Sequence, residues 1–290
     1  MLAFLTTIRH PATASNLAEL ERLFELTATS VCGQTSREFR LIVVCHEKPR
    51  IRFTDEKIYY HYVDWPPPVP DPTQRYPFSH KSIDKGSKLA LATLIARELG
   101  ANWCFPVDAD DWICRSIVQY VHEHHYHHGY IVDRGHFVNW RRLEYKRRRG
   151  LTNFCGSTYC PATSDLLQLM PKLGRTSSLP GWEEIQASVP LDFLEDGFGD
   201  HKIPRYLAKQ GKSMSRLPFF AAAWVMNNGE NIYGSADGGS GRPIDEPFCL
   251  NYSLPTSLVQ SRASSLAARL SETMSYGHSC LECWRKPEVV

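Results

Sequence analysis

The chain has 290 residues, of which 42% are hydrophobic and 22% charged, and its formal net charge at pH 7 is +2. This is the composition of a globular protein with one large or two small domains. A net charge so near zero produces no overall field toward nucleic acid or a membrane, so we expect no nucleic-acid partner.

The apolar segments and the cysteines indicate in which cellular compartment the protein is expected. No stretch approaches the roughly 18 apolar residues that span a bilayer, which predicts no transmembrane segment, while peripheral membrane contact stays open. The first residues, MLAFLTTIRHP, lack the basic start of a secretory signal and are interpreted as a strand. The nine cysteines form no regular framework. Together these features predict a cytoplasmic protein in a reducing setting.

Strand and helix patterns alternate at the beginning of the chain. Residues 2–8, 39–45 and 57–63 are apolar or alternating runs of the kind that strands show. After the first run, apolar residues recur at helical spacing up to residue 31, and Asn16 with Glu19 resembles a capping pair. The order strand, helix, strand, strand predicts an α/β fold with a mostly parallel central sheet flanked by helices.

A proline-rich segment and a long helix follow. Residues 65–77 contain too many prolines for a helix or a central strand, and both a lid and a plain connector fit this segment. Residues 84–99 have one apolar face and end before Gly100, which predicts an amphipathic helix. Lys85 and Lys88 lie at its predicted start, where they face either an anion or solvent.

Three carboxylates end the next apolar run. The segment WCFPVDADDW, residues 103–112, predicts a buried strand that stops at Asp108, Asp110 and Asp111. Ligands of open α/β sheets bind at such strand ends. Clustered acids repel one another and favour a hard divalent cation such as Mg²⁺ or Mn²⁺. The alternative is a helix N-terminus, where aspartates suit the helix dipole.

The second half of the chain contains more loop between its elements. Helices are expected at residues 113–128, 161–169, 203–209 and 258–274, and strands at residues 130–133, 153–159 and 217–226. The histidine-rich residues 122–128 are explained better by a solvated helix end than by a metal site. The basic run at residues 141–149 is interpreted as a solvated face, with contact to phosphate or an acidic acceptor as the alternative. His278, Cys280 and Cys283 amount to half of a zinc site, in a tail expected to be structural or mobile.

Four segments, in order, carry a resemblance to a known family. They are DKGSKLALATLIARELGANWCFPVDADDW, NFCGSTYCPATSDLL, LEDGFGDHKIPRYLAKQG and WVMNNGEN. They resemble the helix and DxD strand, the strand and helix beyond the metal site, the ED segment and the sheet-closing segment of inverting family-2-type glycosyltransferases with the GT-A fold. The resemblance implies one GT-A-like domain over residues 1–234 and a loop-rich extension with one helix over residues 235–290.

The resemblance implies transfer of a sugar from a nucleotide-diphosphate donor, with Mn²⁺ or Mg²⁺ as cofactor. The ion would neutralise charge that grows on the departing diphosphate. Asp110 is then expected as a direct metal ligand, Asp108 as a contact to the ribose or to a metal-bound water, and Asp111 as support for the metal site. Further implied donor contacts are Thr6, Thr7, Arg9 and His46 near the nucleoside and Lys85 or Lys88 at a phosphate.

A catalytic base is implied as well. Asp196 is expected to take the proton of the acceptor hydroxyl, with Glu195 as second choice, and a single displacement with one base inverts the anomeric carbon. A helix N-cap pair is the structural alternative for these two acids. The chain departs from the family at His46, where relatives commonly have an aspartate, and at Asn227 and Asn228, where many relatives have a metal-binding histidine. The third metal ligand is therefore open.

Three functions remain in competition. The first is glycosyl transfer to a hydroxyl of a glycan, a lipid-linked acceptor or a polysaccharide. Nucleotidyl transfer on a related sheet is less well supported, because TTIRHPATAS lacks a glycine-rich phosphate loop. A non-catalytic binding protein would retain the fold and use the basic run at residues 141–149 for a partner.

Overall fold

A parallel four-stranded sheet forms the centre of the N-terminal half. The computed structural model describes residues 1–74, 76–175, 178–200, 202–231 and 241–259. The sheet contains β1 (Leu2–Thr7), β2 (Phe39–Cys45), β3 (Ile58–Tyr62) and β4 (Trp103–Pro106), in the order β3-β2-β1-β4. Every pair in it is parallel. The predicted α/β class with a parallel sheet is confirmed.

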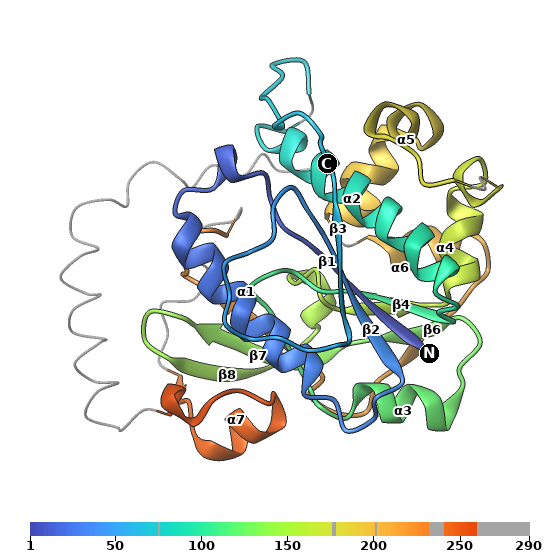
Figure 1. Ribbon diagram of the computed structural model, residues 1–290. Helices are drawn as coiled ribbons and strands as arrows, with labels where there is room; N and C mark the ends of the chain where they lie inside the picture. The colour runs from blue at the N-terminus through green and yellow to red at the C-terminus, as the bar shows by residue number, and fades with distance from the viewer. Residues whose placement is uncertain (75, 176–177, 201, 232–240, 260–290) are drawn as a thin grey trace, which may run out of the picture.

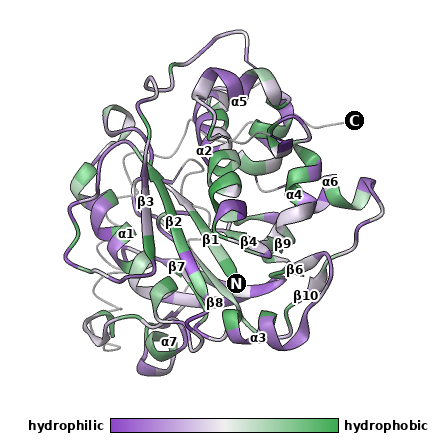
Figure 2. Cartoon of the chain, turned by 45° about the vertical axis from the view of Figure 1, so that its right-hand side comes forward, coloured by the Kyte–Doolittle hydropathy of each residue, from purple (hydrophilic) through white to green (hydrophobic). Residues whose placement is uncertain are grey.

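Two helices cover the opposite faces of this sheet (Figure 1). Alternate strand residues point to opposite sides. Leu2 and Phe4 of β1 pack in one core with α1 (Leu17–Cys32), whereas Ala3 and Leu5 pack in a second core with α2 (Ser79–Glu98). Burial on both sides explains why β1 and β2 are mostly apolar, as their hydrophobic colouring shows (Figure 2); the exceptions are Thr6 and Thr7 at the end of β1 and Arg40 in β2.

The predicted beginning of α1 is confirmed, whereas the predicted beginning of α2 is wrong. At α1 the side chain of Asn16 accepts a hydrogen bond from the backbone N–H of Glu19 at 3.1 Å, which confirms the expected cap. Helix α2 instead begins at Ser79, before the predicted residue 84. Lys85 and Lys88 therefore lie inside the helix and not at its start, so the expectation that placed them there is wrong.

A second sheet continues from the acidic loop after β4. Strand β5 (Trp112–Ile113) pairs antiparallel with β11 (Ala222–Met226), which pairs parallel with β7 (Arg134–Asn139). The order is β12-β8-β7-β11-β5, where β8 is Glu144–Arg149 and β12 is Arg242–Pro243. The connection between β4 and β5, which carries the three aspartates, consequently lies at the junction of the two sheets.

Several expected elements differ in this half. The predicted helix at 113–128 is the shorter α3 (Ile117–His124): Ile113 belongs to β5, and residues 114–116 and 125–128 are not helical. The predicted strand at 153–159 is wrong: the chain forms the short η2 (Leu151–Asn153), a loop and then β9 (Tyr159–Pro161). Within the basic run, residues 141–143 form a turn and residues 144–149 form β8, which pairs antiparallel with β7.

The remaining described elements complete the fold. They are η1 (Pro11–Thr13), β6 (Gly129–Ile131), α4 (Thr163–Leu169), η3 (Leu173–Arg175), α5 (Trp182–Ser188), η4 (Phe193–Gly199), α6 (Ile203–Lys209), β10 (Ser215–Arg216), α7 (Glu246–Asn251) and η5 (Thr256–Leu258). Strand β6 lies between β10 and β9 in a third, small sheet. Within the described ranges, no helix is long and apolar enough to cross a membrane.

Residues 241–259, the described part of the predicted extension, join the main core. Phe248 and Tyr252 are buried in the same cluster as Phe4 and Trp112. The boundary at residue 234 stays a prediction. The expected helix at 258–274 lies outside the described residues except for its first two positions, and His278, Cys280 and Cys283 lie wholly outside them.

Candidate functional site

A pocket opens at the carboxyl ends of β1 and β4. Its walls include Thr7, Arg9, Lys85, Asp108, Asp110 and Asp200. Because β1 and β4 are parallel neighbours, the residues that follow them meet at one sheet edge, which is where the sequence predicts a site.

Asp111 is an internal group of the fold. It is fully buried, and its Oδ1 accepts the backbone N–H of Val225 at 3.0 Å. Its Oδ2 accepts the hydroxyl of Ser157 at 2.6 Å and the thiol of Cys155 at 3.2 Å. Burial, and then the charge of Asp110, raises the pKa of Asp111 well above its ordinary value. Asp111 is not among the residues that line the pocket, and its contacts tie the acidic loop to β11.

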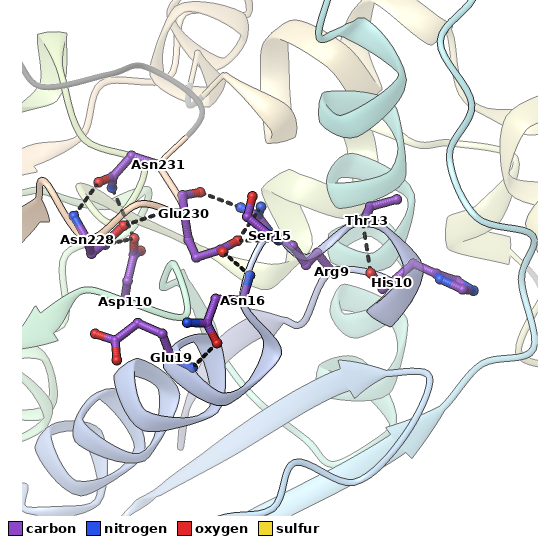
Figure 3. Close-up of polar contacts among 10 residues, drawn as sticks. All are labelled: Arg9, His10, Thr13, Ser15, Asn16, Glu19, Asp110, Asn228, Glu230 and Asn231. Carbon is purple, nitrogen blue, oxygen red and sulfur yellow. Dashed lines mark hydrogen bonds and ion pairs between the residues drawn. The ribbon is translucent and has the colours of Figure 1, made fainter. Parts of the chain in front are cut away.

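Asp110 faces the pocket and is held by two amides. Its Oδ2 accepts hydrogen bonds from the side chains of Asn228 at 2.7 Å and Asn231 at 3.1 Å (Figure 3). Burial, followed by the charge of Asp108, raises the pKa of Asp110 to about 6. The asparagine-rich turn after β11 thus positions this carboxylate directly.

Asp108 forms an ion pair with Lys85, whose Nζ lies 2.5 Å from its Oδ1. Burial acts to lower the pKa of Lys85, but the neighbouring charge of Asp108 outweighs it and the pKa is raised. A Cβ on Gly156 would lie 2.6 Å from Asp108 Oδ2 and 3.2 Å from Lys85 Nζ. Only glycine therefore leaves room for this pair beside the loop that carries residue 156.

Lys88 has a structural place. Its side chain is fully buried, and its Nζ contacts Asp84 Oδ2 at 2.8 Å and the backbone oxygen of Ile8 at 3.1 Å. Burial lowers the pKa of Lys88, with Asp84 acting against it. Lys88 therefore holds the residue that follows β1. Lys85, three residues earlier on α2, lines the pocket.

The predicted nucleoside contacts divide into two groups. Thr7 and Arg9 line the pocket. Thr6 is fully buried and His46 does not line the pocket. Burial, then the charge of Lys88, lowers the pKa of His46 to about 4, and its ring lies against His10 with centroids 4.3 Å apart.

Glu230, in the turn after β11, contacts both the loop after β1 and the beginning of α1 at the pocket wall (Figure 3). Its Oε2 lies 2.8 Å from the Arg9 guanidinium, and its backbone oxygen accepts a second bond from Arg9 at 2.6 Å. Its Oε1 accepts the backbone N–H of Asn16 at 2.7 Å, at the beginning of α1. A carboxylate at a helix N-terminus is favoured by the unpaired N–H groups there. Glu230 thereby fixes Arg9 in the pocket.

The two acids predicted as base candidates lie on η4. The carboxylate of Glu195 accepts a short hydrogen bond from the Ser79 hydroxyl at the start of α2. Asp196 lies 3.0 Å from Lys202 Nζ. Neither residue lines the pocket, whereas Asp200, just past the end of η4, does, and it shares Lys202 at 2.8 Å.

The donor set fits a divalent ion that takes most of its ligands from a substrate. Asp108 and Asp110 offer carboxylate oxygens to the pocket. The amide oxygens of Asn228 and Asn231 already accept backbone N–H groups within their own turn. Among the described residues, no three histidine, cysteine, aspartate or glutamate side chains group as a metal site. One or two carboxylates plus phosphate oxygens is the arrangement in which proteins commonly bind Mg²⁺.

Sequence reasoning missed Asp200, Glu230 and Asn231. Glu230 is a single acid in a polar turn, and Asp200 follows η4 four residues after Asp196, where the resemblance points to the earlier acids, so no local pattern marks either of them. Asn231 lies in the NNGEN turn, which the sequence identifies as a turn only. The signal that places all three is tertiary.

Comparisons with known proteins give a loose structural likeness. The sequence matches no family model and no curated protein. In structure the chain is similar to residues 1–349 of S. aureus TarS, with 11% identity and a TM-score of 0.40 over 77% of this chain. A second TarS structure gives 11% identity and a TM-score of 0.38 over 78% of this chain. The match spans 60% and 36% of those chains, and at such scores the function has to rest on the site itself.

Proposed function

We propose that the chain is a metal-dependent, inverting glycosyltransferase of the GT-A type that uses a nucleotide-diphosphate sugar. The observation that supports this most directly is the charge of the pocket. The described lining has three cationic side chains, Arg9, Lys81 and Lys85, against the five carboxylates Asp84, Asp108, Asp110, Asp200 and Glu230. Lys88 pairs with Asp84, and Lys202 is shared by Asp200 and Asp196, so the excess is a single carboxylate. Among the described residues, Asp110 forms no ion pair.

Arg9 and Lys85 are already paired with Glu230 and Asp108, so a diphosphate beside Asp110 would need a further cation to neutralise its charge. A bound divalent ion supplies that charge and withdraws electron density from the leaving diphosphate. Asp110 is the proposed ligand of the ion, with Asp108 beside it. Asp111 is left out of the metal set because all its described contacts are internal.

The cations on the pocket wall would then contact the diphosphate. Lys85 lies next to Asp108, and Arg9 is held in place by Glu230. Thr7, at the end of β1, lines the pocket and would contact the nucleoside. Thr6, His46 and Lys88 have no wall position, so their roles would be to support the strands and not to contact the donor.

Three acids on or just after η4 are candidates for the catalytic base. The resemblance favours Asp196, with Glu195 as second choice, but the pocket wall contains Asp200. We assign proton removal from the acceptor hydroxyl to Asp200, with Asp196 holding the shared Lys202. Geometry decides first in such assignments, because a general base must reach the proton that it removes.

Calorimetric titration of the full chain with UDP and GDP, with and without Mn²⁺, tests the proposal. We expect binding that requires the ion and that Asp110→Ala weakens by about 10-fold or more, an effect of about 1.4 kcal/mol. Asp133→Ala, which changes an aspartate that does not line the pocket, is the control. Absence of any metal-dependent nucleotide binding would exclude the proposal, and release of pyrophosphate instead of nucleoside diphosphate during turnover would favour nucleotidyl transfer.

A further inference from the structure

Two aromatic rings form the pocket wall on the side of β11. Phe154, just after η2, and Trp224, on β11, line the pocket together with Asp108 and Gly156. The two rings are near-parallel, with an interplanar angle of 25° and centroids 6.3 Å apart. Phe154 is 38% exposed. Aromatic side chains gain by leaving water, so two aligned rings at a charged pocket indicate a ligand that has an apolar face.

Phe137 holds these rings in their orientation. It is buried on β7 and makes T-shaped contacts with Phe154 at 5.4 Å and with Trp224 at 5.1 Å. Trp224 is also the register partner of Phe137 across β11 and β7. Because the rings are fixed before a ligand arrives, binding on them loses little conformational entropy.

Arg148 adds a positive charge beside Phe154, although Arg148 itself is not among the residues that line the pocket. Its guanidinium carbon lies 4.9 Å from the ring centroid of Phe154 and 5.1 Å from that of Phe137. Alternate residues of β8 face opposite sides, so the neighbouring Arg147 covers Phe220 on the other face, at 5.3 Å. In the described ranges, no carboxylate forms an ion pair with Arg148, so its charge is open to an anion.

The aromatic wall lies across the acidic loop from the expected nucleoside position. Thr7 and Arg9 bound the pocket from β1, Phe154 and Trp224 bound it from the β11 side, and Asp108 and Asp110 lie on the connection between the two sheets. If the donor occupies the β1 side, as the proposed function requires, the acceptor approaches the reacting carbon from the β11 side.

We propose that Phe154, Trp224 and Arg148 form an acceptor subsite for an acidic saccharide. This inference rests on the proposed function. A pyranose ring has a face made of C–H groups, which packs on an aromatic face, while its hydroxyls remain available to water or to the reaction. A carboxylate, sulfate or phosphate on the saccharide pairs with Arg148, whose planar guanidinium suits oxyanions.

The test uses the full chain and matched pairs of immobilised oligosaccharides: uronic acid against neutral hexose, sulfated against unsulfated, and phosphorylated against unphosphorylated. We expect the acidic member of at least one pair to bind about 10-fold more tightly than its neutral partner. Phe154→Ala and Trp224→Ala should each weaken that binding by about 10-fold, the scale of a lost ring contact. Arg148→Gln should remove the preference for the acidic member and retain binding of the neutral one.

Two variants on the opposite face of β8 are matched controls. Phe220→Ala and Arg147→Gln remove the same kinds of group from the Arg147–Phe220 contact and should leave saccharide binding unchanged. UDP titration with Mn²⁺ and the thermal unfolding midpoint are measured on every variant. Equal binding of acidic and neutral partners, or wild-type saccharide binding by Phe154→Ala and Trp224→Ala, overturns the subsite. If the wild-type chain binds the saccharide but binds neither UDP nor GDP in the presence of Mn²⁺, the proposed function is overturned and the saccharide result stands, so the two failures are distinct.

Discussion

At the scale of single residues, neighbouring carboxylates of this chain have different environments. Asp110 and Asp111 are adjacent in sequence, yet Asp110 faces the pocket through Asn228 and Asn231, whereas Asp111 is bonded to Ser157 and β11. Like charges at this spacing raise one another's pKa, so the fold has to supply donors to each of them. The asparagines and Ser157 fulfil that requirement without adding charge.

The base candidates Asp196 and Asp200 also differ in environment, because only Asp200 lines the pocket. Asp200→Asn should lower kcat for sugar transfer by about 10²–10⁴-fold with little change in nucleotide binding, because a general base contributes on that scale. Asp196→Asn should have a smaller effect, since Asp196 does not line the pocket. Steady-state rates and UDP titration on both variants give the comparison. A larger loss in Asp196→Asn would return the role to the residue that the resemblance favours.

The sequence predicts single-residue roles only where they depend on neighbours close in the chain. The cluster of acids after a strand is a local pattern, and it was predicted. The burial of Asp111 depends on Ser157 and Val225, and the burial of Lys88 depends on Ile8, which follows β1. No local pattern distinguishes Lys88 from Lys85, three residues earlier, although only Lys85 reaches the pocket.

At the scale of elements, the position of the base candidates depends on the contact between α2 and η4. Gly86 of α2 has the backbone carbonyl of Leu194 where a Cβ would lie, and Gly199 similarly lies against Ser82. Each helix therefore has a glycine at the point of closest approach. The contact carries Glu195, Asp196 and, just beyond η4, Asp200 to the side of the pocket that α2 provides.

Gly86→Ala should disrupt this contact. The new methyl group would overlap a backbone carbonyl that cannot rotate away, and we expect a loss of about 1–3 kcal/mol in the free energy of unfolding, the usual scale of overpacking. Sugar transfer should fall as well, because η4 has to move. Gly181→Ala is the control: a Cβ there meets nothing within 4 Å, and we expect a change of less than about 1 kcal/mol. Urea denaturation measures both, and equal stabilities would contradict the role given to Gly86.

Elements with local signals were predicted most closely. The bounds of β2 and α6 are those expected, because both have local signals. Strand β2 is a nearly continuous apolar run, and α6 has a proline in its first turn and a glycine shortly after its end. The hairpin of β7 and β8 was missed. Charged residues make up the exposed half of β8, and its pairing becomes favourable only through aromatic rings such as Phe137 and Phe220, which lie under its arginines.

At the scale of the whole molecule, the described C-terminal residues pack in the same hydrophobic core as the N-terminal strands. Helix α7 places Phe248 against Trp112, with ring centroids 6.1 Å apart, and against Tyr145 at 4.3 Å. Trp112 directly follows Asp111. The packing of α7 is therefore one contact away from the acidic loop, and a boundary at residue 234 would separate residues that pack together.

Phe248→Ala should accordingly destabilise the entire chain. Phe248 is 4% exposed, and removal of a buried phenyl ring costs about 3–5 kcal/mol through lost burial and the cavity left behind. Leu250→Ala, on the same short helix but 64% exposed, should change the free energy of unfolding by less than about 0.5 kcal/mol. If α7 belonged to a separate extension, Phe248→Ala would leave the main unfolding transition in place and alter only a minor one. A single transition that shifts as a whole, followed by both tryptophan fluorescence and circular dichroism, would instead place α7 in the same cooperative unit as the acidic loop, because coincident transitions report one all-or-none unit.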